Sequence, residues 1–377
     1  MGGEVGPRVG TLRTDRTTPS PPAPLSSRTL NVAFRTGRLA GALTRVRRVQ
    51  GLTMALSRLT QIDCTMPLAD DRVRSRLRGV AVGLLTPFDD DLEIQHDKLE
   101  ANAKSLSGDG ISSFLAAANI SEYHSLTQQE RVDVTETAVD ALPDSACVLA
   151  GVGGSTKAAT DLMDAYDRVG VDAMMVMPPD HTYVHERGLL RYYEKLDAAT
   201  DTPLVPYVRG FDPSVAFLRD LSRIEGVVGV KYAIEDPVKL GSAVAAADDD
   251  VVWVDGLAEP YAVSFWNEGI EGFSAGVSNF RPEIGLALFD ALSEENWERA
   301  REIRDLTLPF QALRGETGED NDLPGAISVP VVKKGLELAG LHGGAVREPI
   351  RSLSAEDERR AEELYEELSD GVARVID

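Results

Sequence analysis

The chain has 377 residues, of which 43% are hydrophobic, and it carries a formal net charge of −22 at pH 7. This composition is typical of a globular protein with a full core. No apolar run approaches the roughly 20 residues that a membrane-spanning helix needs, so we expect no membrane segment. The two cysteines, Cys64 and Cys147, are too few for a disulfide framework or a four-ligand zinc site.

The charge is distributed unevenly along the chain. The first 66 residues contain ten arginines, no lysine and three acidic residues, which leaves 29 basic and 58 acidic residues for the remainder. An acidic, lysine-poor surface repels nucleic acid and suits a high-salt cytoplasm, where salt screens the repulsion between like charges. We therefore expect a cytoplasmic protein of a halophile, such as a haloarchaeon, with a small molecule rather than a nucleic acid as its partner.

Residues 1–75 are rich in Gly, Pro, Ser, Thr and Arg and lack apolar periodicity. This composition predicts a disordered, basic N-terminal extension. An organelle transit peptide has a similar composition. A third interpretation is that translation begins at Met54 or Met66 and that the residues before it belong to a misassigned reading frame.

From Gly79 onward, short apolar runs alternate with segments that have helical spacing and acidic faces. Such alternation predicts parallel strands joined by right-handed helical crossovers, and eight units over about 200 residues fit a (β/α)8 barrel, also called a TIM barrel, over residues 76–280. A doubly wound open sheet remains the alternative. The eight runs are 80–88, 112–118, 146–152, 173–178, 203–208, 227–233, 251–257 and 272–277.

Helical patterns follow the last strand and make up residues 281–377. They predict a C-terminal helical extension packed on the barrel, with helices over 282–292, 296–314, 328–341 and 355–372. The segment 315–325 between the second and third of these helices is rich in glycine and acidic residues. We expect this segment to be a mobile loop.

Lys231 is the candidate that stands out for chemistry. It closes the apolar run 227–233, whereas the other seven lysines lie in or next to segments with helical patterns. Burial disfavours the ammonium form, and a neutral amine is the nucleophile that forms a Schiff base with a ketone or aldehyde. The alternative is a lysine that extends from the strand edge to solvent.

Active sites of (β/α)8 barrels form at the carboxyl ends of the strands. Tyr207 is suited to transfer protons during Schiff-base formation, and the hydroxyl, amide and guanidinium groups are suited to bind a carboxylate or hydroxyl groups. No metal ligands or cofactor motif accompany them, so we expect neither a metal nor another cofactor. The residues selected by this rule are Thr86, Asn119, Ser121, Glu122, Tyr207, Arg209, Lys231, Ser278 and Asn279.

Several motifs resemble those of the dihydrodipicolinate synthase and N-acetylneuraminate lyase family of class I aldolases and dehydratases. The resemblance extends from Gly79 to the C-terminal end. The motifs are Leu-Thr-Pro-Phe at 85–88, Ser-Glu-Tyr-His-Ser-Leu-Thr at 121–127, Ala-Gly-Val-Gly at 150–153, Gly-Val-Lys at 229–231, Gly-Val-Ser-Asn-Phe-Arg-Pro at 276–282, the run 332–341 and Val-Arg-Glu-Pro at 346–349.

This resemblance implies a barrel with a helical extension, a homotetramer built as a dimer of dimers, Lys231 as the Schiff-base lysine and Tyr207 as the proton-transferring tyrosine. Within the family, the segments 308–314 and 326–329 and the Tyr-Val-Arg at 207–209 resemble most the 5-dehydro-4-deoxyglucarate dehydratases. We therefore expect dehydration of a 2-keto-3-deoxy sugar acid. The alternatives are a pyruvate-dependent aldolase, a dihydrodipicolinate synthase-like condensation, and a catalytically silent barrel that binds a sugar acid.

Two departures from the family pattern affect these expectations. Where the family usually carries Gly-Thr-Thr-Gly-Glu, the chain has Ala-Asn-Ile-Ser-Glu at 118–122, so Ile120 replaces a hydroxyl of the usual carboxylate-binding loop. Asp180 and His181 occupy the place of the paired tyrosines of dihydrodipicolinate synthases. The first departure favours Asn119 and Ser121 as the substitute donors, and the second argues against dihydrodipicolinate synthase activity.

Overall fold

Eight short parallel strands form a closed barrel, in which each strand pairs with its neighbours in chain order and β8 pairs with β1. The computed structural model describes residues 69–376. Every strand residue is buried, as expected when helices cover the outside of a parallel sheet. The strands are β1 Val80–Gly83, β2 Ser113–Ala116, β3 Cys147–Val152, β4 Ala173–Val176, β5 Leu204–Val208, β6 Gly229–Tyr232, β7 Val252–Asp255 and β8 Gly272–Ala275.

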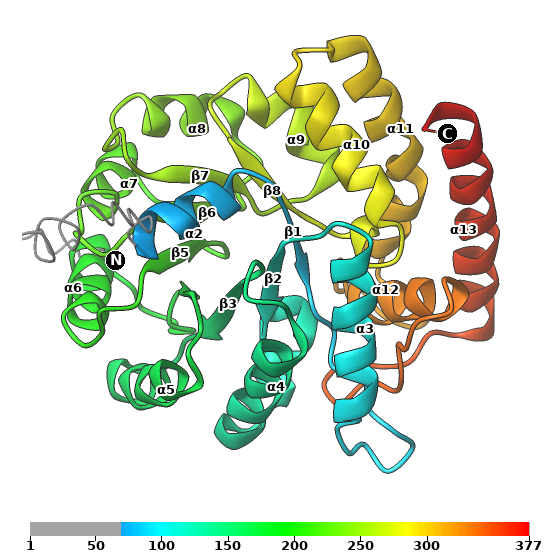
Figure 1. Cartoon of the computed structure of the whole chain (residues 1–377), viewed down its shortest axis with the longest axis horizontal. Coiled ribbons are helices and arrows are strands. Elements are labelled where there is room, and N and C mark those ends of the chain that lie inside the picture. The colour runs from blue at the N-terminus through cyan, green and yellow to red at the C-terminus, as the bar shows by residue number, and fades with distance from the viewer. Residues whose placement is uncertain (1–68, 377) are drawn as a thin grey trace, which may run out of the picture. The chain divides into compact units, whose positions relative to one another are not determined.

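A helix follows each strand and packs on the outside of the barrel (Figure 1). Polar residues begin several of these helices by accepting a backbone N–H of the first turn; Thr127 and Glu130 form a complete capping box at α4. The eight helices are α3 His96–Gly108, α4 Gln128–Ala141, α5 Thr156–Val169, α6 Glu186–Asp197, α7 Val215–Leu221, α8 Pro237–Val244, α9 Glu259–Trp266 and α10 Pro282–Ser293. The predicted (β/α)8 barrel is confirmed.

Helix α2, Ala69–Leu77, covers the end of the barrel at which the strands begin, and it lies in front of the strands in Figure 1. Its Leu77 packs against the bare backbone of Gly229 and Gly272, where a Cβ atom would lie 2.6 and 2.0 Å from atoms of Leu77. The expectation of disorder up to residue 75 therefore does not hold for residues 69–75, because Val73 and Leu77 are buried. Residues 1–68 lie outside the described part of the chain.

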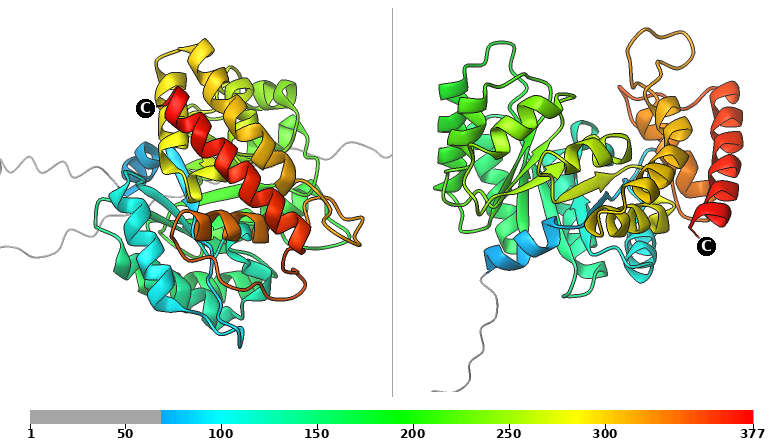
Figure 2. Two further views of the ribbon diagram at one scale, coloured as in Figure 1. Left: turned by 90° about the vertical axis from the view of Figure 1, so that its right-hand side faces the viewer. Right: turned by 90° about the horizontal axis from the view of Figure 1, so that it is seen from above.

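The helices after β8 divide into two groups. Helix α10 completes the eighth strand–helix unit and contacts β1, so it belongs to the barrel rather than to the predicted extension. The extension consists of α11 Trp297–Arg314, α12 Ser328–Leu338 and α13 Ala355–Val375. Helix α13 packs against both α11 and α12 (Figure 2).

Aromatic residues attach the extension to the barrel. Phe280, just after β8, lies 4.9 Å from Phe310 of α11 and 5.9 Å from Tyr365 of α13, measured between ring centroids. The extension therefore shares a continuous apolar core with the barrel. None of the helices in the described range 69–376 is both long and apolar enough to cross a membrane.

Candidate active site

Lys231 and Tyr207 lie side by side on adjacent strands. They are register partners in the pairing of β5 with β6, and the Lys231 Nζ lies 4.1 Å from the centroid of the Tyr207 ring. Lys231 is 8% exposed. Burial lowers the pKa of its ammonium group, with Arg209 acting in the same direction and Tyr207 opposing it. The surroundings of Lys231 therefore favour the neutral amine that we expected from the sequence.

Tyr207 has two cationic neighbours. Its hydroxyl oxygen accepts a hydrogen bond of 3.1 Å from Nη1 of Arg209. Burial alone raises the pKa of this phenol, but the positive charges of Lys231 and Arg209 outweigh that effect, and the pKa of Tyr207 is lowered. A phenol with a lowered pKa, in contact with a buried amine, is suited to donate and accept protons.

Asp255 lies at the end of β7, the strand next to that of Lys231. Its side chain is fully buried, and burial raises its pKa well above the ordinary value for a carboxyl group. Its Oδ1 accepts the Leu257 N–H at 2.6 Å, while Oδ2 has no partner among the described residues. Our sequence analysis missed Asp255, although the rule that selects residues at strand ends applies to it as well.

The carboxyl ends of the strands enclose a main cavity of about 490 Å³. Of the nine predicted site residues, four line it, namely Asn119, Tyr207, Arg209 and Lys231. Three elements thus bring an amine, a phenol, a guanidinium and an amide to one space. Such a set can form a Schiff base with a carbonyl compound, move protons at it and bind its polar groups.

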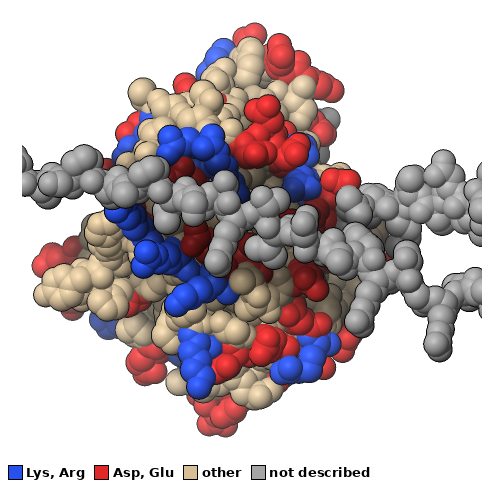
Figure 3. All heavy atoms as spheres, turned by 90° about the vertical axis from the view of Figure 1, so that its left-hand side faces the viewer, with Lys and Arg blue, Asp and Glu red and all other residues tan. Residues whose placement is uncertain are grey.

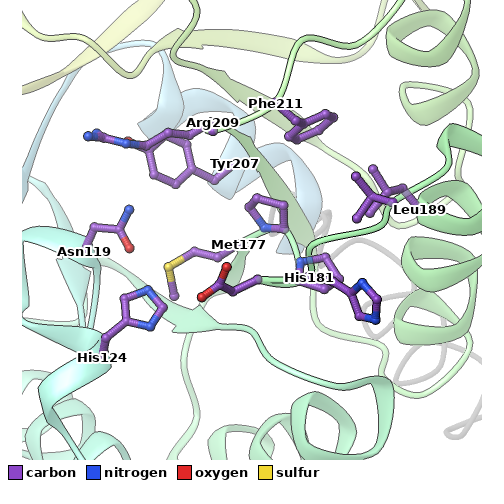
Figure 4. Close-up of a pocket in the computed structure, with 13 residues that line it drawn as sticks. Asn119, His124, Met177, His181, Leu189, Tyr207, Arg209 and Phe211 are labelled. Carbon is purple, nitrogen blue, oxygen red and sulfur yellow. The ribbon is translucent and has the colours of Figure 1, made fainter.

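A smaller cavity of about 270 Å³ adjoins the main cavity and shares Asn119, Tyr207 and Arg209 with it. Figure 4 shows Asn119 and His124 on one side of this second cavity and Leu189 and Phe211 on the other. Asp180 and His181, which replace the expected tyrosines, also line it. The space available to a ligand therefore continues past Arg209.

Four predicted residues are buried beside the main cavity without lining it. Thr86 donates to the Ser121 carbonyl oxygen at 2.8 Å. Nδ2 of Asn279 donates to the carbonyl oxygens of Ala275, which ends β8, and of Gly276. The hydroxyls of Ser121 and Ser278 have no partner among the described residues. Thr86 and Asn279 thus hold the loops that surround the site, and a substrate contact of these four residues stays a prediction.

Glu122 has a different position from the one expected. Its carboxylate forms a buried ion pair of 2.6 Å with Lys333 of α12 and accepts the Arg347 backbone N–H at 3.0 Å. The carboxylate thus faces the C-terminal region, and a substrate contact of Glu122 stays a prediction. The family-like motif gave no sign of this, because Lys333 is 211 residues away in sequence.

The loop 118–121 is bracketed by two non-glycine residues with left-handed backbone, Ala117 at φ 47° and Glu122 at φ 61°. Such conformations cost on the order of 1–2 kcal/mol each and cluster at functional sites. A close contact accompanies them, since a Cβ atom on Gly151 would lie 2.0 Å from the Ala117 carbonyl oxygen. Ile120 packs over Gly83 at the end of β1 and lines the main cavity.

The extension also lines the main cavity, which the sequence analysis did not predict. Helix α11 contributes Gln311 and Arg314, and the first turn of α12 contributes Ser328 and Val329. Parts of the segment 315–325, predicted as a mobile loop, line it too, and the Gly325 N–H donates to the Gly315 carbonyl oxygen at 2.9 Å. A helix outside the barrel gives no signal of this kind in its sequence.

Metal-binding side chains are not grouped in this part of the molecule. Residues 69–376 contain no cluster of three or more His, Cys, Asp or Glu side chains placed to hold an ion. His181 and His185, which have the spacing of a helical ligand pair, each accept a backbone N–H two residues ahead, from Tyr183 and Arg187. Their ring nitrogens therefore stabilise local turns.

Relatives with known names match most of the chain. A probable 5-dehydro-4-deoxyglucarate dehydratase 2 of Streptomyces avermitilis is 30% identical over 292 residues, covering 76% of this chain and 86% of the relative. A probable 5-dehydro-4-deoxyglucarate dehydratase of Bacillus subtilis is 26% identical over 305 residues, covering 78% and 97%.

Solved structures of dihydrodipicolinate synthases are also similar to this chain. The dihydrodipicolinate synthase of Oceanobacillus iheyensis superposes with a TM-score of 0.76 at 28% identity, covering 80% of this chain and 100% of that one. The dihydrodipicolinate synthase of Bacillus clausii gives 0.75 at 28% identity, covering 79% and 99%. The sequence model of the dihydrodipicolinate synthetase family matches residues 76–368, and the chain therefore belongs to that family.

Proposed function

We propose that the protein is a lyase that forms a Schiff base through Lys231 and dehydrates a 2-keto-3-deoxy sugar acid of the 5-dehydro-4-deoxyglucarate type. The observation that carries the proposal is the buried contact of Lys231 with Tyr207 at the carboxyl ends of β5 and β6. The two relatives described above, both named as probable dehydratases of this compound, support the choice of substrate.

The chemistry begins with attack of the neutral Lys231 amine on the ketone carbon. Tyr207, hydrogen-bonded to Arg209, supplies the proton with which the carbinolamine oxygen leaves as water, and a protonated Schiff base remains. The phenolate left on Tyr207 then takes a proton from the neighbouring methylene carbon, and the electron pair of that C–H bond neutralises the nitrogen, giving an enamine. The enamine expels the hydroxyl group of the next carbon, which takes the proton back from Tyr207 and leaves as water. Hydrolysis of the unsaturated Schiff base that results frees the product and Lys231.

Borohydride trapping tests this proposal. Reduction of the Schiff base fixes the substrate on the protein, so intact-mass measurement should show one adduct with pyruvate and one with the keto acid. Lys231→Ala should abolish both adducts, whereas Lys104→Ala, which changes an exposed lysine of α3 paired with Glu100, should keep them. Absence of an adduct from folded wild-type protein would refute the proposal and favour a silent sugar-acid-binding barrel.

The identity of the product separates the enzymatic alternatives. An aldolase that uses the same Schiff base releases pyruvate, whereas a dehydratase releases a keto acid with one water fewer. Dihydrodipicolinate synthase-like condensation has support from the 28% identity to two structures of that name. The replacement of the paired tyrosines by Asp180 and His181 weighs against it. Mass analysis of the products of each incubation decides among the three.

We further propose a cytoplasmic homotetramer adapted to high salt and independent of metal ions. Acidic side chains are numerous on the face in Figure 3, with basic side chains between them, and salt screens their mutual repulsion. Size-exclusion chromatography coupled to light scattering, in low and in molar KCl, measures the assembly. Activity that survives dialysis against EDTA supports metal independence, and activity lost on dialysis and restored by a divalent ion contradicts it.

A further inference from the structure

Arg314, the last residue of α11, brings a second guanidinium group to the main cavity. It is half-buried and lines that cavity together with Arg209 and Lys231. Its Nη1 donates to the side-chain oxygen of Gln311 at 2.6 Å, and its Nη2 donates to the Ser328 hydroxyl at 3.2 Å. Both partners are neutral, and the buried Nε has no partner among the described residues.

Glu259 is the nearest candidate to neutralise Arg314, but other groups bind it. Its carboxylate accepts the backbone N–H groups of Gly276 and Val277 at 3.1 and 3.0 Å and a hydrogen bond from the Gln311 amide. Within residues 69–376, no carboxylate lies within the 4.0 Å of an ion pair with Arg314. The Gln311 side chain therefore lies between the Glu259 carboxylate and the Arg314 guanidinium and is hydrogen-bonded to both.

The position of Arg314 depends on the absence of a side chain at the end of β8. A Cβ atom on Gly276 would lie 1.8 Å from the Arg314 Nη1. The guanidinium thus rests directly on the backbone that follows β8, and this close approach is available only at a glycine. The fold places the group at a strand end, where the barrel presents its reactive residues.

The surroundings of Arg314 favour an anion. Arg209, Lys231 and the first turn of α12 line the same cavity, and the amino end of a helix carries partial positive charge. The acidic side chain that lines the cavity is Glu235, which is exposed. A guanidinium matches the geometry of a carboxylate through two parallel hydrogen bonds.

The separation between Arg314 and Lys231 suits a molecule with a ketone at one end and a carboxylate at the other. Lys231 lies on β6 and Arg314 rests at the end of β8, with β7 between them. Neighbouring strands lie about 4.8 Å apart, so the two anchoring points are on the order of 10 Å apart. The Lys231 side chain, together with a six-carbon acid between it and the Arg314 guanidinium, spans that distance.

We propose that Arg314 binds the far carboxylate of a 2-keto-3-deoxy sugar diacid, and so selects diacids over monoacids. This inference rests on the proposed function, because it takes Lys231 as the group that holds the ketone end. The carboxylate next to the ketone is left to Asn119 and Arg209, which line the same cavity. Arg314 is then a residue of substrate specificity that belongs to the extension rather than to the barrel.

The test compares three keto acids on Arg314→Gln. They are the six-carbon diacid, the matching monoacid with a hydroxymethyl group in place of the far carboxylate, and pyruvate. We expect kcat/KM for the diacid, and the affinity measured by its borohydride adduct, to fall about 10- to 100-fold, as for loss of hydrogen bonds to a charged group. The adducts with the monoacid and with pyruvate should change less than about twofold.

Control variants separate binding from folding. Arg301→Gln removes an exposed arginine of the same helix, outside the cavity, and should leave all three acids unaffected. Arg314→Lys keeps the charge and should recover part of the preference for the diacid. An equal loss with pyruvate and the diacid, or no loss with either, would overturn the inference while leaving the Schiff-base chemistry in place. If wild-type protein forms no adduct with any of the three acids, the proposed function itself fails.

Discussion

The floor and the outer wall of the main cavity come from different parts of the chain. The floor consists of strand ends, with Tyr207 on β5 and Lys231 on the adjacent β6. The wall is made by Arg314 and Gln311 of α11 and by the first turn of α12. We expect Lys231 and Tyr207 to act at the reacting carbon or its neighbour, and the wall residues to contact the rest of the substrate.

This difference separates the residues expected to carry out the reaction from the residues expected to select the substrate. Schiff-base chemistry needs a buried amine and a proton donor in fixed contact, and paired strands supply the most rigid frame for that contact. Substrate choice needs only a group placed at the right distance, which a helix outside the barrel supplies as well. Substitutions in the floor should therefore affect all substrates, and substitutions in the wall should affect some of them.

The largest expected effect is that of Tyr207→Phe. Removing the hydroxyl takes away the proton donor next to Lys231 while the ring remains, so kcat should fall about 10²- to 10⁴-fold for every accepted keto acid. Steady-state rates measure this loss. Tyr193→Phe is the matched control, because the buried hydroxyl of Tyr193 on α6 has no partner in the described structure. A loss of kcat confined to the diacid would mean that Tyr207 selects the substrate rather than transfers protons.

The next effect concerns the buried ion pair between Glu122, in the loop after β2, and Lys333 of α12. Lys333→Met leaves the buried Glu122 carboxylate without its partner at 2.6 Å, which should lower the free energy of unfolding by about 3–5 kcal/mol. Urea denaturation at fixed salt measures this change. The double variant with Glu122→Gln should be less destabilised than the sum of the two single variants. Additive changes would show that the two side chains are not coupled.

The ends of the strands were predictable, and the contacts across the barrel mouth were not. Lys231 is recognisable because a charge closes an apolar run, and Tyr207 and Arg209 follow from the same rule. Arg314 ends a helix of mixed polarity, where an arginine ordinarily faces water, and only folding brings it over Gly276. The ion pair of Glu122 was unpredictable for the same reason, since its partner Lys333 follows it by 211 residues. Asp255 also ends a strand, and the sequence analysis did not select it.

The smallest expected effect is a shift in pH dependence. Schiff-base formation needs the neutral amine, so its rate should rise with pH and level off above the pKa of Lys231. Burial lowers that pKa, and the charge of Arg209 lowers it further, whereas Arg314 is not among the causes. The rising limb should therefore lie below the range of an ordinary lysine, whose pKa is 10.5.

Two variants test the origin of that limb. Arg209→Gln removes a cation that disfavours the ammonium form, so the pKa of Lys231 should rise and the limb should move to higher pH. Arg314→Gln should leave the limb where it is. The measurement is the rate of pyruvate adduct formation against pH at constant ionic strength. If Arg314→Gln shifts the rising limb of the pH profile and Arg209→Gln does not, the residues of the wall rather than Arg209 control the protonation of Lys231.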